Sequence, residues 1–372
     1  MSPLSSKTIQ FMRFPLAAAI VFQHSYKVIT SAKSPEVADT LTWQSLDFMR
    51  GFFSWVISSP ALIAYGLIAG YLFFQHWEEV ESLPLKWNWK RYADKIYRRL
   101  FSLFLPYIVW NLLTAWYMHS PITWHIFWDY SVWGQDRTNI FSLPLCPTCA
   151  PIDNPFWFVR DLFIISLCAP IIYPVVRYGK RWSVLLAVIM FVFQVPHFLP
   201  SQTLVASFMI GAYLSVNQLD LAQVARKVWH PALWIVVALS WVMLYTDGIA
   251  DQLVPPIIKV ILTLFYFYSA TVIAEKKTWA TPAWLAEASI VIYAGHAGLG
   301  VLNKCTVWAT TIIPDSASGG LIAVRYFLAP TMCIAIFLIV YRLIYPSFIA
   351  KVLSGKCPPI KLPKSVKKKI NR

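Results

Sequence analysis

Long apolar stretches are the feature that most constrains how this chain can fold. Ten of them can be drawn: residues 8–30, 51–76, 100–118, 156–176, 182–197, 201–216, 231–246, 252–274, 284–303 and 320–345. About 20 apolar residues in a helix cross the hydrocarbon core of a bilayer, and a helix satisfies its own backbone hydrogen bonds there. The sequence therefore predicts an all-α, polytopic membrane bundle of about ten transmembrane helices, with soft boundaries at the fifth to seventh.

The composition supports a membrane protein and argues against a nucleic-acid-binding one. The chain is 58% hydrophobic and only 13% charged, whereas about a quarter of the residues of a soluble domain are charged. A net charge of +15 is compatible with nucleic-acid binding. The basic residues, however, are dispersed between the apolar stretches and gathered at the C-terminus, so we expect no nucleic-acid partner and attribute them to membrane topology.

The distribution of Lys and Arg predicts the orientation. If the N-terminus is cytoplasmic, the loops on its side carry most of the basic residues. The opposite loops carry Lys33, Arg50, Arg137 and Lys304. Because cytoplasmic loops are enriched in Lys and Arg, we expect both termini to be cytoplasmic, with residues 31–50 and 119–155 outside.

The chain divides into one transmembrane domain, residues 1–350, and a basic tail, residues 351–372. The tail includes KLPKSVKKKINR, which is suited to anionic lipid and to which we assign no catalysis. The long outer loop is rich in Trp, and its aromatic side chains fit either an interfacial belt or stacking on sugar rings. The loop also contains Cys146 and Cys149. Two ligands fall short of a zinc site, so we expect a disulfide or free thiols and no metal.

The first apolar stretch contains two ionisable side chains, Arg13 and His24. Ionisable groups within a membrane span are energetically costly and usually have a function. Eleven residues correspond to three helical turns plus about 20°, so both lie on one stripe, roughly 16 Å apart. That distance is too long for an ion pair. The two side chains serve either two parts of one long ligand or unrelated purposes, in which Arg13 reaches the headgroups and His24 bonds to a neighbouring helix.

Three later segments carry further candidate residues. Their polar or aromatic side chains are Arg98 and Arg99, then Trp157, Arg160 and Asp161, then Tyr293 and His296. Cations at a helix start are disfavoured by the helix dipole, so the arginine pair indicates positive-inside topology or a phosphate site. His296 is expected near the depth of His24, where the two imidazoles can share a site or where His296 is a hydrogen-bonded core residue.

Taken in order, these pieces resemble the membrane-bound acyltransferase 3 family. The matching pieces are Arg13 followed after ten residues by His24, then RRLFSLFLPYIVWN, NPFWFVRDL and the late Tyr293-x-x-His296. One departure is Ala69 where family members usually have Ser before Gly-Tyr-Leu. The resemblance implies an O-acyltransferase of a bacterial cytoplasmic membrane, with acyl-CoA, usually acetyl-CoA, as donor substrate, a cell-envelope carbohydrate as acceptor and no permanently bound cofactor.

The resemblance also implies roles for the candidate residues. Arg13 and either Arg98 or Arg99 would hold the donor phosphates, and His24 would act as general base. His296 or Arg160 would position the acceptor or stabilise an oxyanion, Asp161 would orient an imidazole, and Trp157 and Tyr293 would bind substrate. The alternative function is a transporter or exporter of an envelope glycan or another anionic solute. A transporter would also have ionisable groups inside its helical bundle. Many transporters are built from inverted repeats, and none is visible in this sequence.

Overall fold

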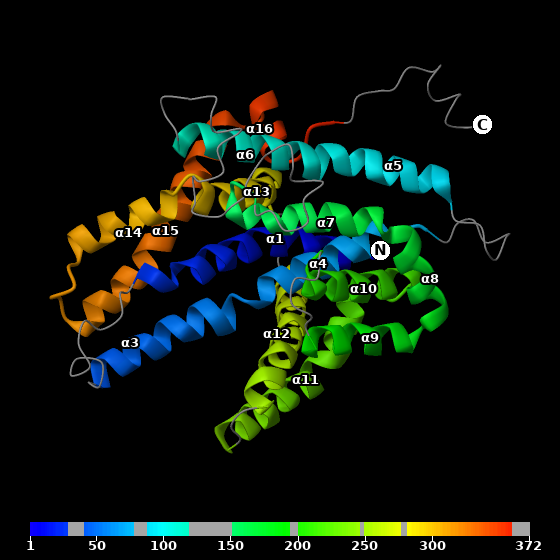
Figure 1. Ribbon diagram of the computed structural model, residues 1–372, viewed down its shortest axis with the longest axis horizontal. Helices are drawn as coiled ribbons and strands as arrows, with labels where there is room; N and C mark the ends of the chain where they lie inside the picture. Colours follow the sequence, from blue (N-terminus) through cyan, green and yellow to red (C-terminus); the bar gives the residue numbers. More distant parts are fainter. Residues whose placement is uncertain are drawn as a thin grey trace.

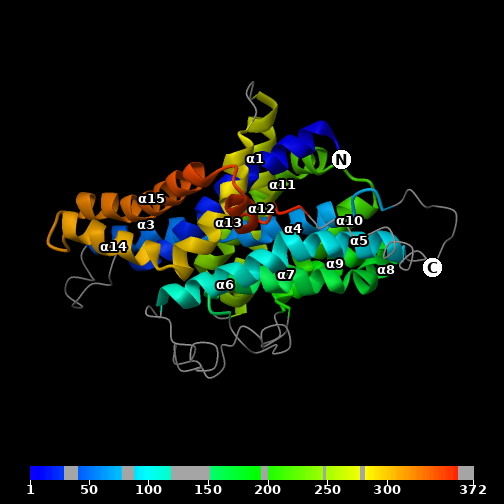
Figure 2. The same ribbon diagram turned by 90° about the horizontal axis from the view of Figure 1, so that it is seen from above.

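The computed structural model describes residues 1–28, 41–77, 88–118, 151–193, 200–245, 249–276 and 281–358. Within these ranges every regular element is helical, which confirms the all-α class (Figures 1 and 2). Cys146, Cys149, most of the outer loop and residues 359–372 lie outside the described residues. The predictions made for them stay predictions.

The α-helices follow one another from the N-terminus, with four short 3-10 or π segments among the described residues, of which η2 (Phe52–Ile57) lies between α3 and α4 and the other three are given below. The first half comprises α1 (Pro3–His24), α3 (Leu41–Gly51), α4 (Pro60–Phe73), α5 (Trp89–Arg99), α6 (Leu105–Met118), α7 (Trp157–Leu167), α8 (Ala169–Gly179) and α9 (Arg181–Val192). The second half comprises α10 (Gln202–Val216), α11 (Leu221–Tyr245), α12 (Ile249–Lys276), α13 (Ala283–Gly298), α14 (Val301–Ile312), α15 (Gly319–Ile344) and α16 (Phe348–Leu353). The other three short segments are η1 (Ser25–Val28) after α1, η3 (Leu100–Phe104) between α5 and α6, and η6 (Asn154–Phe156) before α7.

The described residues form a multi-pass membrane bundle with fewer straight spans than the sequence suggested. Four helical stretches are long and apolar enough to cross a membrane, and three bent helix pairs raise that number to as many as seven. The count of about ten helices is therefore not confirmed. The pair α7–α8 bends by 68° and α10–α11 by 120°, and α9 has only 12 residues, so several apolar stretches form bent pairs or a short helix rather than straight spans.

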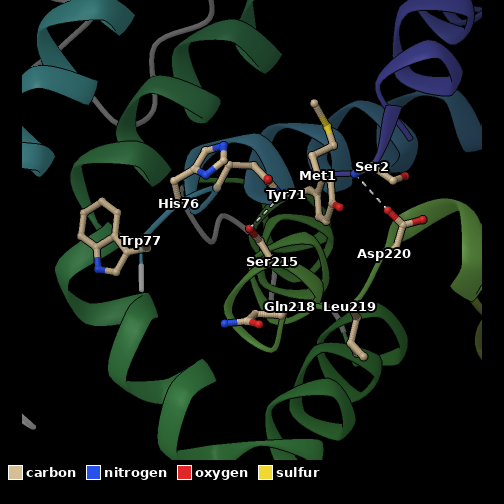
Figure 3. A pocket seen from close by; sticks show the side chains of 10 residues that line it. Met1, Ser2, Tyr71, His76, Trp77, Ser215, Gln218, Leu219 and Asp220 are labelled. Carbon is tan, nitrogen blue, oxygen red and sulfur yellow. Dashed lines mark hydrogen bonds between the residues drawn. The ribbon is translucent and has the colours of Figure 1, made fainter. Parts of the chain in front are cut away.

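Helix α1 lies at the centre of the bundle, against α4, α12 and α13 (Figure 1). Its first turn is anchored where α10 meets α11. There the Asp220 carboxylate accepts hydrogen bonds from the backbone N–H of Ser2 and, at 2.9 Å, from the Ser5 hydroxyl. Figure 3 shows the bond from Ser2 beside a cavity of about 470 Å³. Because the start of α1 is fixed in this way, the positions of Arg13 and His24 along its axis follow from the helical rise per residue.

Small residues let α4 and α10 pack backbone to backbone. A Cβ on Gly70 would overlap the carbonyl oxygen of Phe208, and a Cβ on Gly211 would overlap that of Leu67. Only Gly fits at such a contact, which is how small residues hold membrane helices together in the absence of a hydrophobic driving force.

Helix α5 crosses the end of α4 and supplies cations to its last carbonyl groups. Lys95 donates to the carbonyl oxygens of Phe73 and Gln75, and Arg99 donates to that of Ala69 at 3.1 Å. Basic side chains at a helix C-terminus satisfy its free carbonyls and its dipole. These bonds fix α5 against the end of α4. The hairpin of α11 and α12 instead projects away from α5 (Figure 1).

Candidate active site

A cavity of about 540 Å³ opens between α1, α4, α5, α7, α13 and the segment that follows α16. The ionisable side chains that distinguish it are Arg13, Arg98, Arg99, Lys356 and Glu287. Four cations face one carboxylate, and Glu287 also accepts a hydrogen bond from the Tyr341 hydroxyl at 3.1 Å. The excess of fixed positive charge makes this cavity suited to an anionic ligand.

The sequence left open whether Arg98 or Arg99 would face a ligand, and in the structure the two adjacent arginines share one cavity. Both Arg98 and Arg99 line it. Arg99 is half-buried, and its guanidinium lies 4.9 Å from the ring centre of Phe73 in addition to its bond with α4. Arg98 is exposed. The pair therefore offers one cation fixed by the protein and one at the open side.

Aromatic side chains also line the cavity. Tyr65, Phe156, Phe158 and Tyr293 line it, and the ring of Phe158 lies 6.1 Å from those of Tyr65 and Tyr293. The Tyr65 hydroxyl donates to the carbonyl oxygen of Arg13 at 2.7 Å, and the Tyr293 hydroxyl donates to that of Pro155. These bonds hold the rings in place. A cavity that combines several cations with fixed aromatic walls suits a long ligand with a charged head.

His24 and His296 form a direct pair at the far end of α1. The Nε2 atom of His296 lies 3.0 Å from Nδ1 of His24, and the ring centres are 4.9 Å apart. His24 is exposed, whereas His296 is fully buried. The structure therefore confirms the expectation that the imidazoles meet at one level, and it makes His24 the accessible member.

The hydrogen-bond pattern assigns the proton positions. Nδ1 of His296 lies 2.6 Å from the carbonyl oxygen of Tyr293, so it must carry hydrogen because a carbonyl only accepts. In the neutral ring Nε2 is then an acceptor, and it receives the Nδ1–H of His24, which also lies 3.0 Å from the carbonyl oxygen of Ile20. Nε2 of His24 is left unprotonated, and no described residue hydrogen-bonds to it. This is the arrangement of an oriented base.

Tyr293 links the cavity to the imidazole pair. It lines the cavity, and its ring centre lies 6.3 Å from that of His296, one turn further along α13. On α1, Arg13 and His24 are roughly 16 Å apart along the axis. Tyr293 thus lies between the lining of the cavity and the imidazole pair, while neither His24 nor His296 is among the residues that line the cavity.

Three predicted residues lie on α7, outside the described lining of this cavity. The Asp161 carboxylate accepts from Nε of Arg160 at 2.9 Å and from the backbone N–H of Ser201 at 2.8 Å, so it ties α7 to the start of α10. Arg160 lines a separate cavity of about 80 Å³. Trp157 is half-buried and packs edge-on against Phe158 at 6.1 Å. Asp161 makes no hydrogen bond to an imidazole in the described part of the chain.

The structure adds residues that the sequence did not single out. Lys356 belongs to the region predicted as a basic tail, and Glu287 lies about 1.7 turns before Tyr293 on α13. Asp153 is buried beside Gly298, and neither of its carboxylate oxygens has a hydrogen-bond partner among the described residues. Its position before Asn-Pro suggested only a helix start, so no sequence signal distinguished this buried acid.

Asp153 is expected to make stability fall as the pH rises. Burial raises the pKa of its carboxyl group well above the usual value of 3.8. The unfolded chain then ionises at a lower pH than the folded one, so stability is highest below about pH 4 and is lost as the pH rises toward the folded pKa. We expect Asp153→Asn to remove this loss and to give an equal or higher Tm at pH 7–8, by thermal unfolding in detergent.

Asp94→Asn is the matched control, because Asp94 is exposed on α5. Its effect on Tm should not change between pH 5 and pH 8. If the difference in Tm between Asp153→Asn and the wild type were also constant over that range, Asp153 would not be a neutral acid in the fold.

One comparison with known proteins bears on this site. A family model described as an acyltransferase domain matches residues 7–342. The match includes every candidate site residue predicted from the sequence, and it ends before Lys356. No curated protein and no solved structure matches the chain significantly.

Proposed function

Since the chain belongs to the acyltransferase 3 family, we propose that it is an O-acyltransferase that moves an acyl group from acyl-CoA to a hydroxyl of a cell-envelope or exported carbohydrate. Acetyl is the proposed acyl group. The observation that supports the proposal is the cationic cavity whose lining residue Tyr293 lies 6.3 Å, between ring centres, from His296 of the hydrogen-bonded pair of His24 and His296.

The donor is proposed to bind by its phosphates at the cations of the cavity. Arg13 and Arg99 are half-buried, and fixed guanidinium groups bind phosphate oxygens in paired hydrogen bonds. The pantetheine arm then runs along the aromatic walls toward Tyr293. Arg13 and His24 are roughly 16 Å apart along α1, comparable to the reach of that arm, so the thioester is carried toward His24.

His24 is proposed as the general base. Its free Nε2 takes the proton of the acceptor hydroxyl while the hydroxyl oxygen attacks the thioester carbonyl carbon. The new ester bond forms as the carbon–sulfur bond breaks, and the coenzyme leaves as a thiolate that regains the proton. Proton transfer to a positioned imidazole contributes about 10²–10⁴-fold in rate, or about 3–5.5 kcal/mol.

His296 and the α7 residues are proposed as positioning residues. His296 accepts from Nδ1–H of His24 and so keeps Nε2 as the basic nitrogen. Asp161 and Arg160 hold α7, whose first turn presents Phe158 to the cavity. Trp157, which packs edge-on against Phe158, is proposed to contact the carbohydrate acceptor.

We further propose that both termini are cytoplasmic in a bacterial cytoplasmic membrane. The Lys and Arg bias between loops supports this orientation, which puts the cations of the cavity on the side where acyl-CoA is made. Labelling of single-cysteine variants in intact cells tests it. A cysteine near Lys33 should react with an impermeant reagent and one near Lys86 should not. The reverse pattern would contradict this orientation.

The function is tested with the purified full chain, labelled acetyl-CoA and an envelope glycan extract. We expect release of free CoA in step with labelling of the glycan, and no labelling when the acceptor hydroxyls are blocked. Reconstituted vesicles that pass an unmodified glycan without any release of CoA would overturn the enzyme proposal and favour a transporter.

A further inference from the structure

The chain beyond the region matched by the family model returns to the cavity. Helix α16 ends at Leu353, whose carbonyl oxygen accepts a hydrogen bond from the Trp110 indole at 3.1 Å. Ser354 and Gly355 are buried. Gly355 has φ of +67°, and a Cβ there would overlap the carbonyl oxygen of Ser102. A turn that tolerates only Gly seats this segment firmly on η3.

Lys356 follows this fixed turn and lines the same cavity as Arg13, Arg98 and Glu287. Although Lys356 is exposed as a residue, partial desolvation of its ammonium group lowers its pKa, the nearby charge of Arg13 lowers the pKa further, and Glu287 opposes the shift. The ammonium group therefore shares one electrostatic environment with the arginine of α1. A lysine free in a disordered tail would not be placed in this way.

The four cations differ in depth. Arg13 and Arg99 are half-buried, whereas Arg98 and Lys356 are exposed, which places the latter pair at the open mouth. Acyl-CoA carries its diphosphate between the pantetheine arm and the nucleoside, and its 3′-phosphate on the ribose beyond. A donor whose thioester points toward His24 presents the diphosphate to the deeper arginines and the 3′-phosphate to the mouth.

From this placement we propose that residues 354–356 form the cytoplasmic wall of the donor site and that Lys356 binds the 3′-phosphate of acyl-CoA. The inference rests on the proposed function, which it makes more specific. A single ammonium group is sufficient for this role, because a terminal phosphate monoester can be bound by a point charge and does not require the two parallel hydrogen bonds of a guanidinium group.

The experiment compares acetyl-CoA with 3′-dephospho-acetyl-CoA as donors for the full chain in detergent, by calorimetry and by steady-state kinetics. For Lys356→Gln we expect Kd and KM for acetyl-CoA to rise about tenfold, the effect of one charge-assisted hydrogen bond at an exposed position, with kcat nearly unchanged. With the dephospho donor, the wild type and Lys356→Gln should bind equally. Lys356→Arg should keep most of the affinity.

Two further variants complete the comparison. Lys351→Gln removes an exposed charge from α16 that is not among the described cavity residues, so it should bind both donors as the wild type does. Arg13→Gln should weaken both donors, because the diphosphate is common to them. These two variants separate a loss of tail charge in general from a loss at the site.

Three results would overturn the inference. They are an unchanged Kd of Lys356→Gln for acetyl-CoA, an equal loss for the two donors, and a loss of the same size in Lys351→Gln. Each of them leaves acyl transfer by the wild type intact and so spares the proposed function. A wild-type protein that binds neither donor would instead contradict the proposed function itself.

Discussion

Replacing His24 with Gln is expected to lower turnover roughly 10²–10⁴-fold while the donor still binds. Gln keeps much of the size of His, and its amide can donate to Nε2 of His296, but it cannot take a proton at the position of Nε2. The lost interaction belongs to the transition state, so kcat should fall while the Kd for acetyl-CoA stays near that of the wild type. Single-turnover kinetics and calorimetry measure the two quantities.

His230→Gln is the matched control, since His230 is an exposed imidazole on α11, away from the site. It should leave kcat, Kd and Tm unchanged. Thermal unfolding of His24→Gln must match the wild type, because an unfolded protein would imitate the loss. A folded His24→Gln enzyme that keeps more than about a tenth of wild-type turnover would remove His24 from the role of base.

The second large effect is expected at His296, through His24 rather than through contact with the substrate. His296→Leu removes the acceptor of the Nδ1–H of His24, so the ring loses its fixed orientation and tautomer. Loss of such an orienting partner lowers turnover by up to about 10⁴-fold in comparable sites, and we expect roughly 10²-fold or more here. KM for the donor should change little.

His296→Gln distinguishes orientation from packing. Its amide oxygen can accept the proton of His24 as Nε2 does, whereas Leu fills the space without an acceptor. We expect Gln to restore at least a tenth of wild-type kcat, with Tm values of the two variants compared in the same detergent. Equal turnover in the Leu and Gln variants, both folded, would mean that His296 only packs the core.

The role of Asp161 illustrates what a motif leaves open. Its place beside Arg160 in the first turn of α7 suggested a partner for an imidazole. In the structure both oxygens are engaged, one by Arg160 and one by the backbone of Ser201, 40 residues away. The motif marks a fixed helix start, but the identity of its partner depends on a loop that no local pattern predicts.

Lys356 shows the same limit at the C-terminus. It belongs to residues 351–372, for which the sequence predicts a basic tail suited to anionic lipid. The structure turns the chain at Gly355, whose backbone contacts Ser102, and the next side chain lines the cavity. Composition describes how soluble a segment is. Composition does not indicate which part of the protein the segment will contact once the preceding helix has positioned it.

The sequence by itself determined the helical class, the membrane setting and the axial spacing of Arg13 and His24. Apolar length and the geometry of one helix decide these properties, and both are local. Only the tertiary structure decided that His296 lies behind His24, that Lys356 joins the arginines, and that three helix pairs bend by 68°, 120° and 69°. Those features depend on how helices distant in sequence pack against one another. Apolar helix surfaces are similar and allow many arrangements, and small residues such as Gly70 and Gly211 favour one of them by allowing close backbone contact.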